Sequence, residues 1–251
     1  MRYLINTSTD PAYNLAFDDW CLEHLQTPDT VFCLWRNAPS VIIGRNQKPE
    51  AEVNLQFLRE QGIILVRRST GGGAVYHDLG NVNYSFFRPI LSEDNTLSEE
   101  FHDRAVENIA AVLQRMGVDA RIGGRNDIFV GERKVSGFAK RIWRDRVLVH
   151  GTLMYDVDLD TLTQALDAPG SKLRCKGVTS VRSRVMNLRE MLPQFGCTEE
   201  FMAALQSELE GLDGGNERLD VFFPGRPAGA KTHGDVSGIG PLPVFKTEIT
   251  P

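Results

Sequence analysis

The stretch Arg67-Arg68-Ser69-Thr70-Gly71-Gly72-Gly73-Ala74-Val75-Tyr76-His77-Asp78 decides how this chain is interpreted. It follows an apolar run at residues 63–66 and precedes a second strand-like run at residues 82–87. Both runs predict buried strands, so the stretch predicts a turn between two strands. Three consecutive glycines cost conformational entropy. They therefore indicate a backbone that approaches another group closely or takes positive φ.

This turn has two interpretations. Successive backbone N–H groups in a glycine-rich turn can form an anion-binding concavity. A neighbouring arginine offers a planar fork that suits phosphate or carboxylate. The alternative is a hairpin turn with solvated arginines. The paired Arg67 and Arg68, with His77 and Asp78 just beyond, favour the anion site.

Composition indicates a globular enzyme rather than a nucleic-acid or membrane protein. The 251 residues suit one large domain, alone or with a small appendage. A hydrophobic fraction of 41% is ordinary, and a net charge of -5 argues against a broad nucleic-acid surface. The four cysteines are widely spaced, which argues against a zinc ribbon or a disulfide framework. With no signal-peptide core and no run of membrane-spanning length, we expect a cytoplasmic location.

Helix and strand signals alternate along the chain. Asp10 and Pro11 predict a helix start, and Ser98 predicts the cap of the clearest helix, which continues to Gly117. We expect further helices at residues 52–60, 159–166 and 198–209. The expected strands lie at residues 31–35, 40–44, 118–122, 127–130, 133–139 and 146–155. From Gly211 onward, glycine and proline predict an extended or irregular tail.

Asp127 and Lys134 stand on either side of a predicted tight hairpin at Gly131-Glu132. A lysine beside a carboxylate stays charged, and in a cleft it could neutralise a carboxylate and a phosphate together. Spacing alone favours the alternative, a surface lysine on an edge strand. On the next predicted strand, Gly151 indicates a close backbone approach. His150 beside it is, by itself, more often structural than catalytic.

These motifs together resemble lipoate–protein ligase A, of the biotin/lipoate ligase and octanoyltransferase superfamily. The series RRSTGGGAVYHDLGNVNYSF, GRNDI, RKVSGFA, HGTL and KGVTSVRSRVMNL stands in the family's order, and the resemblance covers roughly residues 10–210. No single piece would be specific, but the combination is. The Gly-Arg-Gly-Arg type of nucleotide loop found in biotin ligases does not occur in the sequence.

The resemblance implies an α+β fold, a mixed β-sheet flanked by helices, with a bifurcated pocket for lipoate and ATP. It implies two steps, with Mg²⁺ assisting the first. The lipoate carboxylate attacks the α-phosphate of ATP and releases pyrophosphate; a carrier lysine then attacks the lipoyl-adenylate. The implied partners are apo lipoyl domains of 2-oxoacid dehydrogenase acyltransferase subunits, or the glycine-cleavage carrier protein. No nucleic-acid or membrane partner is expected.

The resemblance also assigns roles to residues. Lys134 would be catalytic and bridge the lipoyl carbonyl and the phosphate, while Asp127 would orient Lys134 or contact the adenosine. Arg68 would hold phosphate, and residues 176–184 would order over the adenylate. The residues expected to bind substrate or nucleotide are Arg68, Gly71, Gly72, Gly73, Ala74, Val75, Tyr76, His77, Asn81, Asn126, Asp127, Lys134, Ser136, Gly137, His150, Gly151, Thr152, Arg182 and Arg184. No metal ligand is assigned.

The sequence departs from the family pattern at two places. Many members carry an accessory domain after the catalytic domain, here residues 1–210. We expect residues 211–251 to be a tail without that domain. The chain would then work with a separate small accessory chain or else accept preformed lipoyl-adenylate. Cys175 stands where ligases more often have serine. Octanoyltransferases of this fold use a cysteine thioester, so an octanoyl or lipoyl transferase with Cys175 as nucleophile is the alternative. A non-catalytic sensor of lipoate is disfavoured, because Lys134 and the glycines are present.

Overall fold

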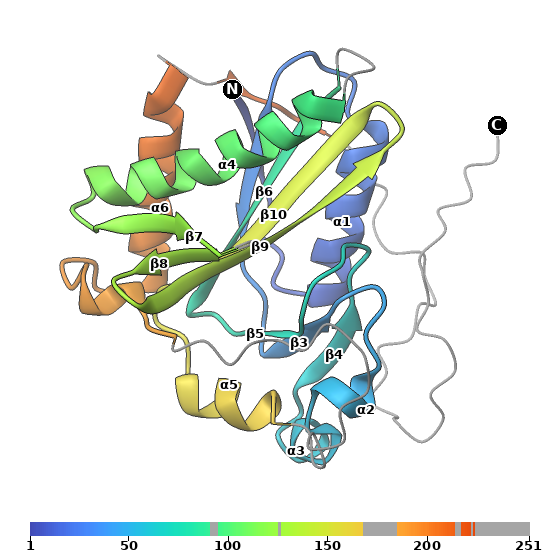
Figure 1. The fold of residues 1–251 in the computed structure, drawn as a ribbon, viewed down its shortest axis with the longest axis vertical. Coiled ribbons are helices and arrows are strands. Elements are labelled where there is room, and N and C mark those ends of the chain that lie inside the picture. The colour runs from blue at the N-terminus through green and yellow to red at the C-terminus, as the bar shows by residue number, and fades with distance from the viewer. Residues whose placement is uncertain (91–94, 125–126, 168–184, 214–216, 222, 224–251) are drawn as a thin grey trace.

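The largest element is an eight-stranded mixed sheet (Figure 1). The computed structural model describes residues 1–90, 95–124, 127–167, 185–213, 217–221 and 223. The strands run in the order β11 (Glu217–Arg218), β1 (Arg2–Ile5), β2 (Val31–Trp35), β6 (Asn81–Pro89), β10 (Arg146–Met154), β9 (Arg133–Trp143), β8 (Asp127–Val130) and β7 (Ala120–Gly123). β1 pairs in parallel with β2 and β11, and the remaining pairs are antiparallel.

A second, three-stranded sheet has the order β4 (Ile64–Arg67), β3 (Ser40–Ile43), β5 (Val75–His77). β4 is parallel and β5 antiparallel to β3. The sequence predicted that the glycine-rich turn leads directly to the strand at residues 82–87. The structure places β5 between them, so the turn crosses over the end of β3. Short helices α2 (Pro49–Glu52), α3 (Leu55–Glu60) and α5 (Leu159–Ala165) lie beside this sheet (Figure 1).

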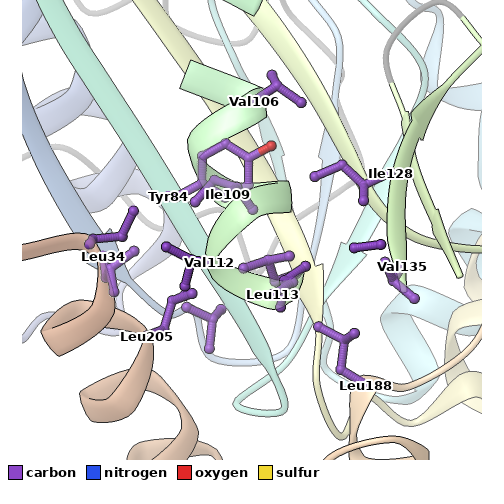
Figure 2. Close-up of a cluster of buried hydrophobic side chains, with 14 of the residues drawn as sticks. Leu34, Tyr84, Val106, Ile109, Val112, Leu113, Ile128, Val135, Leu188 and Leu205 are labelled. Carbon is purple, nitrogen blue, oxygen red and sulfur yellow. The ribbon is translucent and has the colours of Figure 1, made fainter. Parts of the chain in front are cut away.

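Helices cover both faces of the large sheet. α4 (Asn95–Arg115) and α6 (Thr198–Glu210) pack on one face and α1 (Pro11–His24) on the other (Figure 1). Because side chains alternate along a strand, Tyr84 and Phe86 of β6 join the core under α4, whereas Phe87 joins the core under α1. Figure 2 shows the α4 side of this arrangement, where Ile109, Val112 and Leu113 meet Tyr84. The remaining short elements are η1 (Leu188–Glu190) and η2 (Gly211–Asp213).

Most predicted elements are confirmed, and their boundaries shift for local reasons. Asp10 caps α1 by accepting hydrogen bonds from the backbone N–H groups of residues 12 and 13. The helix predicted at residues 52–60 is two helices, because Val53 is extended and Asn54 caps the second. α4 begins at Asn95, before the predicted cap Ser98. No helix in the described part of the chain has the length and apolar character needed to cross a membrane.

Candidate functional site

Arg68 shapes the glycine-rich loop, defined here as residues 68–74. Its guanidinium is buried and donates hydrogen bonds to the carbonyl oxygens of Ile42 (3.1 Å), Gly71 (2.7 Å) and Gly73 (2.8 Å), and to Thr70 Oγ1 (3.0 Å). Burial lowers the Arg68 pKa to about 10. The sequence predicted that Arg68 holds phosphate. In the structure, most of its hydrogen-bond donors bind the loop itself, and the contact with phosphate stays a prediction.

The predicted close backbone approach is present at Gly72, where φ is +92°. A Cβ atom at Gly44, just after β3, would lie 2.2 Å from the Gly72 carbonyl oxygen. The Arg45 N–H donates to the Thr70 carbonyl oxygen at 2.8 Å. Arg67 Nη1 donates to the carbonyl oxygens of Gly44, Arg45 and Gln47. Glycine is therefore required on both sides where the loop crosses the end of β3.

Lys134 and Asp127 form an ion pair with an Nζ–Oδ1 distance of 2.7 Å, which confirms the predicted contact across the hairpin. Both side chains are about one-fifth exposed, at 23% and 19%. A register shift lies between them, because Ile128 pairs with Ser136 but Phe129 pairs with Lys134. Val135 is therefore an extra residue, a β-bulge.

The bulge decides where Lys134 points. In a regular strand, Lys134 and Gly137 would face opposite sides of the sheet, because they are three residues apart. The extra residue brings Lys134 to the same face as Gly137 and Asp127. A Cβ atom at Gly137 would lie 2.9 Å from Lys134 Nζ and 3.1 Å from its Cε. The lysine therefore lies across the space that the missing side chain leaves.

A chain of buried hydrogen bonds joins the glycine-rich loop to β10. His150 Nε2 lies 2.8 Å from Thr70 Oγ1, and His150 Nδ1 lies 2.9 Å from Asp18 Oδ2. The other oxygen of Asp18 accepts from Ser85 Oγ at 2.7 Å. Burial raises the Asp18 pKa, and its bonds to His150 and Ser85 oppose that rise. His150 thus fixes the loop over the large sheet. The sequence interpretation missed Asp18, whose one signal is a carboxylate on the largely apolar face of α1.

His77 is buried and uncharged. Asn37 Nδ2 lies 3.0 Å from His77 Nδ1, and the Asn37 oxygen accepts from Asn14 Nδ2 at 2.8 Å. This arrangement makes His77 Nδ1 an acceptor, so the ring proton is on Nε2. Burial, followed by the nearby charges of Arg68 and His150, lowers the His77 pKa to about 3.

Ser136 and Gly151 face the core instead of the face that carries Lys134. Ser136 Oγ lies 3.3 Å from the Tyr84 hydroxyl. A Cβ atom at Gly151 would lie 2.3 Å from the same hydroxyl. The close approach predicted at Gly151 is thus made by Tyr84. These two side-chain positions support the sheet beneath the site.

The other predicted residues divide between the site face and the surrounding core. Thr152 accepts from the Gly137 N–H at 3.3 Å, on the Lys134 face. Asn81 is buried and donates to Asn83. Ala74, Val75 and Tyr76 continue from the loop into β5. Asn126, Cys175, Arg182 and Arg184 lie outside the described residues. The chain resumes at Val185, which bridges to Lys134.

The sequence model described as "Lipoyl protein ligase A/B catalytic domain" matches residues 10–210. The chain belongs to this family. It is 43% identical to lipoate-protein ligase LplJ of Bacillus subtilis over 198 residues, which are 78% of this chain and 58% of LplJ. It is 40% identical to lipoate–protein ligase 1 of Staphylococcus aureus over 212 residues, covering 84% of this chain and 63% of that protein. The chain thus spans about three-fifths of the length of these curated relatives.

Solved structures of lipoate–protein ligases share this fold. A bi-partite ligase from Thermoplasma acidophilum, in a study that includes its E2 lipoyl domain, aligns at TM-score 0.72 and 34% identity, over 87% of both chains. A lipoate–protein ligase A bound with ATP aligns at 0.71 and 30%, over 87% of this chain and 89% of that one. P. falciparum LipL1 in complex with lipoate aligns at 0.69 and 28%, over 87% and 66%. The predicted family and fold class are confirmed.

Proposed function

We propose that this chain is the catalytic domain of a lipoate–protein ligase. It would activate lipoate with ATP to lipoyl-AMP and transfer the lipoyl group to a lysine of a lipoyl carrier domain. The observation that carries the proposal is the Lys134–Asp127 pair, which lies on the sheet face that His150 connects to the glycine-rich loop. The lipoate-bound and ATP-bound relatives support it.

The activation step brings two anions together. The lipoate carboxylate oxygen forms a bond to the α-phosphorus of ATP, the bond to the β-phosphate oxygen breaks, and pyrophosphate leaves. Lys134 would lower the barrier by placing an ammonium between the carboxylate and the phosphate. Pre-placed charge of this kind does not need to reorganise during the reaction. Asp127 holds the ammonium at 2.7 Å, so its position is set before substrate binds.

In the transfer step, the carrier lysine amine forms an amide bond to the lipoyl carbonyl carbon, and AMP leaves with the bonding electron pair. The amine loses one proton, which passes to solvent. Lys134 would again stabilise charge, now on the carbonyl oxygen and the departing phosphate. A mixed anhydride hydrolyses readily, so the site must also exclude water. We propose that the segment containing Arg182 and Arg184 contributes to this, since the chain rejoins the described structure beside Lys134.

The proposal includes Mg²⁺, which would bind together with ATP. No group of three or more His, Cys, Asp or Glu side chains suited to a metal occurs in the described part of the chain. Mg²⁺ commonly keeps several waters and binds through substrate phosphates with one or two carboxylates. Asp127 is a carboxylate on the site face, so the residues present fit an ion held mainly by the ATP phosphates. The ion would neutralise phosphate charge when bound.

The proposal is tested by supplying the chain with either the substrates of the first step or the intermediate of the second. The purified chain is incubated with an apo lipoyl domain and either lipoate, ATP and Mg²⁺ or synthetic lipoyl-AMP. Carrier mass and pyrophosphate are then measured. We expect lipoyl transfer from lipoyl-AMP, and expect activation from ATP to need a separate accessory chain. Full activity from ATP with this chain alone would remove the accessory chain from the proposal. Absence of transfer from lipoyl-AMP would reject the ligase.

Lys134→Ala and Cys175→Ser separate the ligase from the transferase. Loss of Lys134 should abolish transfer without unfolding the chain, a cost on the order of several kcal/mol in the transition state. A ligase needs no thiol, so Cys175→Ser should be nearly silent. A covalent octanoyl adduct seen by intact mass and lost in Cys175→Ser would instead establish the acyl transferase.

A further inference from the structure

The two halves of the candidate site belong to different sheets. The glycine-rich loop connects β4 to β5 in the three-stranded sheet, whereas Lys134 lies on β9 of the eight-stranded sheet. Within the described residues, no strand of one sheet pairs with a strand of the other. The distance between the loop and Lys134 therefore depends on side-chain contacts between the sheets.

One carboxylate oxygen connects both halves. Asp19 Oδ1 accepts a hydrogen bond from Ser69 Oγ at 2.5 Å and another from Arg141 Nη1 at 2.7 Å. Ser69 belongs to the glycine-rich loop, and Arg141 lies on β9, the strand that carries Lys134. Asp19 itself is on α1. A helix, the loop and the strand thus meet at a single atom.

The Arg141 end of this contact is well fixed. Its side chain is 18% exposed, and its Nη2 lies 3.5 Å from Glu23 Oε1. Its guanidinium carbon lies 5.0 Å from the centre of the Trp143 ring, a distance suited to a cation–π contact. Both hydrogen bonds to Asp19 are charge-assisted, the stronger class of hydrogen bond. The loop is therefore tied to a side chain that has little freedom of its own.

Asp18, the residue before Asp19, fixes the next loop residue, Thr70, through His150. Asp18 contacts His150, which contacts Thr70. Two successive acids of α1 thus fix two successive hydroxyl residues of the loop, Asp19 directly and Asp18 through a histidine. The Asp18 path is buried, whereas the Asp19 side chain is 36% exposed. Asp19 can therefore be changed without opening the core.

We propose that Asp19 is a positioning residue, which holds the glycine-rich loop at a fixed distance from Lys134 through Ser69 and Arg141. Its effect on catalysis rests on the proposed function; its effect on the loop does not. Formation of lipoyl-AMP needs the phosphate at the loop and the ammonium of Lys134 at the correct positions relative to each other. A displacement of about 1 Å can cost on the order of a hundredfold in rate. Because the Asp18 path remains, Asp19→Ala should lower kcat/KM for lipoyl-AMP formation by roughly tenfold to a hundredfold.

The experiment uses the full chain and four changes. Asp19→Ala and Ser69→Ala remove the contact from either side, alone and combined. Asp19→Asn keeps an oxygen that accepts from both donors and should restore most of the activity. Glu23→Ala is the matched control, because it removes an acid from the same helix but leaves Arg141 its shorter contact to Asp19 and its contact to Trp143. The order parameters of the backbone amides of residues 71–73, from ¹⁵N relaxation, report on the loop independently of activity.

The proposal expects lower order parameters in Asp19→Ala and in Ser69→Ala, with no further decrease in the double variant. Asp19→Asn and Glu23→Ala should match the unchanged protein. Unchanged order parameters in Asp19→Ala, or additive effects in the double variant, would overturn the proposal. If the unchanged protein, with any accessory chain supplied, forms no lipoyl-AMP, the proposed function fails. The relaxation data would still decide whether Asp19 holds the loop.

Discussion

Gly137→Ala tests whether the missing side chain at residue 137 sets the position of the Lys134 ammonium. A methyl group at this position would lie 2.9 Å from Lys134 Nζ, 3.1 Å from its Cε and 3.6 Å from Asp127 Oδ1. Favourable contacts between heavy atoms begin near about 3.5 Å, so the amine must move by roughly half an ångström or more. The amine is the end of a flexible side chain and can give way. We therefore expect a stability loss below about 1 kcal/mol, the low end of the cost of overpacking a core.

The catalytic cost should be larger than the stability cost. A displaced ammonium no longer sits where the carboxylate and phosphate meet, and about 1 Å of misplacement can cost a hundredfold. We expect kcat/KM for lipoylation to fall by roughly tenfold to a hundredfold, which is about 1.4 to 2.7 kcal/mol. The assay follows the mass of an apo lipoyl domain supplied with lipoyl-AMP, together with urea unfolding. Gly211→Ala is the control, since its Cβ would meet no atom within 4 Å and its φ is -73°.

A double-mutant cycle shows whether Gly137 acts through Lys134. In a Lys134→Ala background, a methyl group at residue 137 has no amine to displace, so Gly137→Ala should not change stability in that background. If Gly137→Ala alone lipoylates the carrier at a rate within about twofold of the unchanged protein, the reasoning is refuted. An equal stability loss in both backgrounds would also refute it, because the effect would then come from the backbone.

Three further predictions concern Arg68, His77 and Asn54. Arg68→Lys should destabilise the protein by about 2 to 4 kcal/mol in urea, because one ammonium cannot replace a buried fork that donates to three carbonyl oxygens and one hydroxyl; a change below about 0.5 kcal/mol would contradict this. The unfolded chain takes up a proton on His77 near its ordinary pKa of 6.5, but the folded chain does so near 3. This contribution to stability is present above pH 6.5 and should fall by about 2 kcal/mol by about pH 5. His77→Gln should lack that part of the slope. Asn54→Asp should leave α3 intact in urea, since aspartate caps a helix as well as asparagine.

The sequence predicted those features that depend on local chemistry. Asp10 and Pro11 gave the start of α1, and Gly131 gave the β8–β9 hairpin, where its φ is +58°. The contact between Asp127 and Lys134 followed from the hairpin alone. The fold class came from motif order, and the family comparison confirms it. Short-range signals were sufficient for all of these.

The missed features depend on contacts between distant segments. Nothing near Val135 in the sequence marks the bulge that turns Lys134 to the Gly137 face, because register is set jointly by two strands. Asp18 and Asp19 looked like ordinary helix residues until the fold placed them against the loop, about fifty residues further along the chain. The placement of the Ser136 side chain could not be predicted for a similar reason, since the same bulge leaves it on the core face.

Arg68 determines how the glycine-rich loop presents its backbone N–H groups. Its Nη2 donates hydrogen bonds to the carbonyl oxygens of Gly71 and Gly73. In a trans peptide, the N–H of the next residue points opposite to the carbonyl. With both carbonyls turned toward Arg68, the N–H groups of Gly72 and Ala74 point away from it. The arginine thus orients backbone donors, and these are the groups that form an anion-binding concavity. We therefore expect phosphate at this loop to be bound by these N–H groups, which the buried Arg68 guanidinium orients.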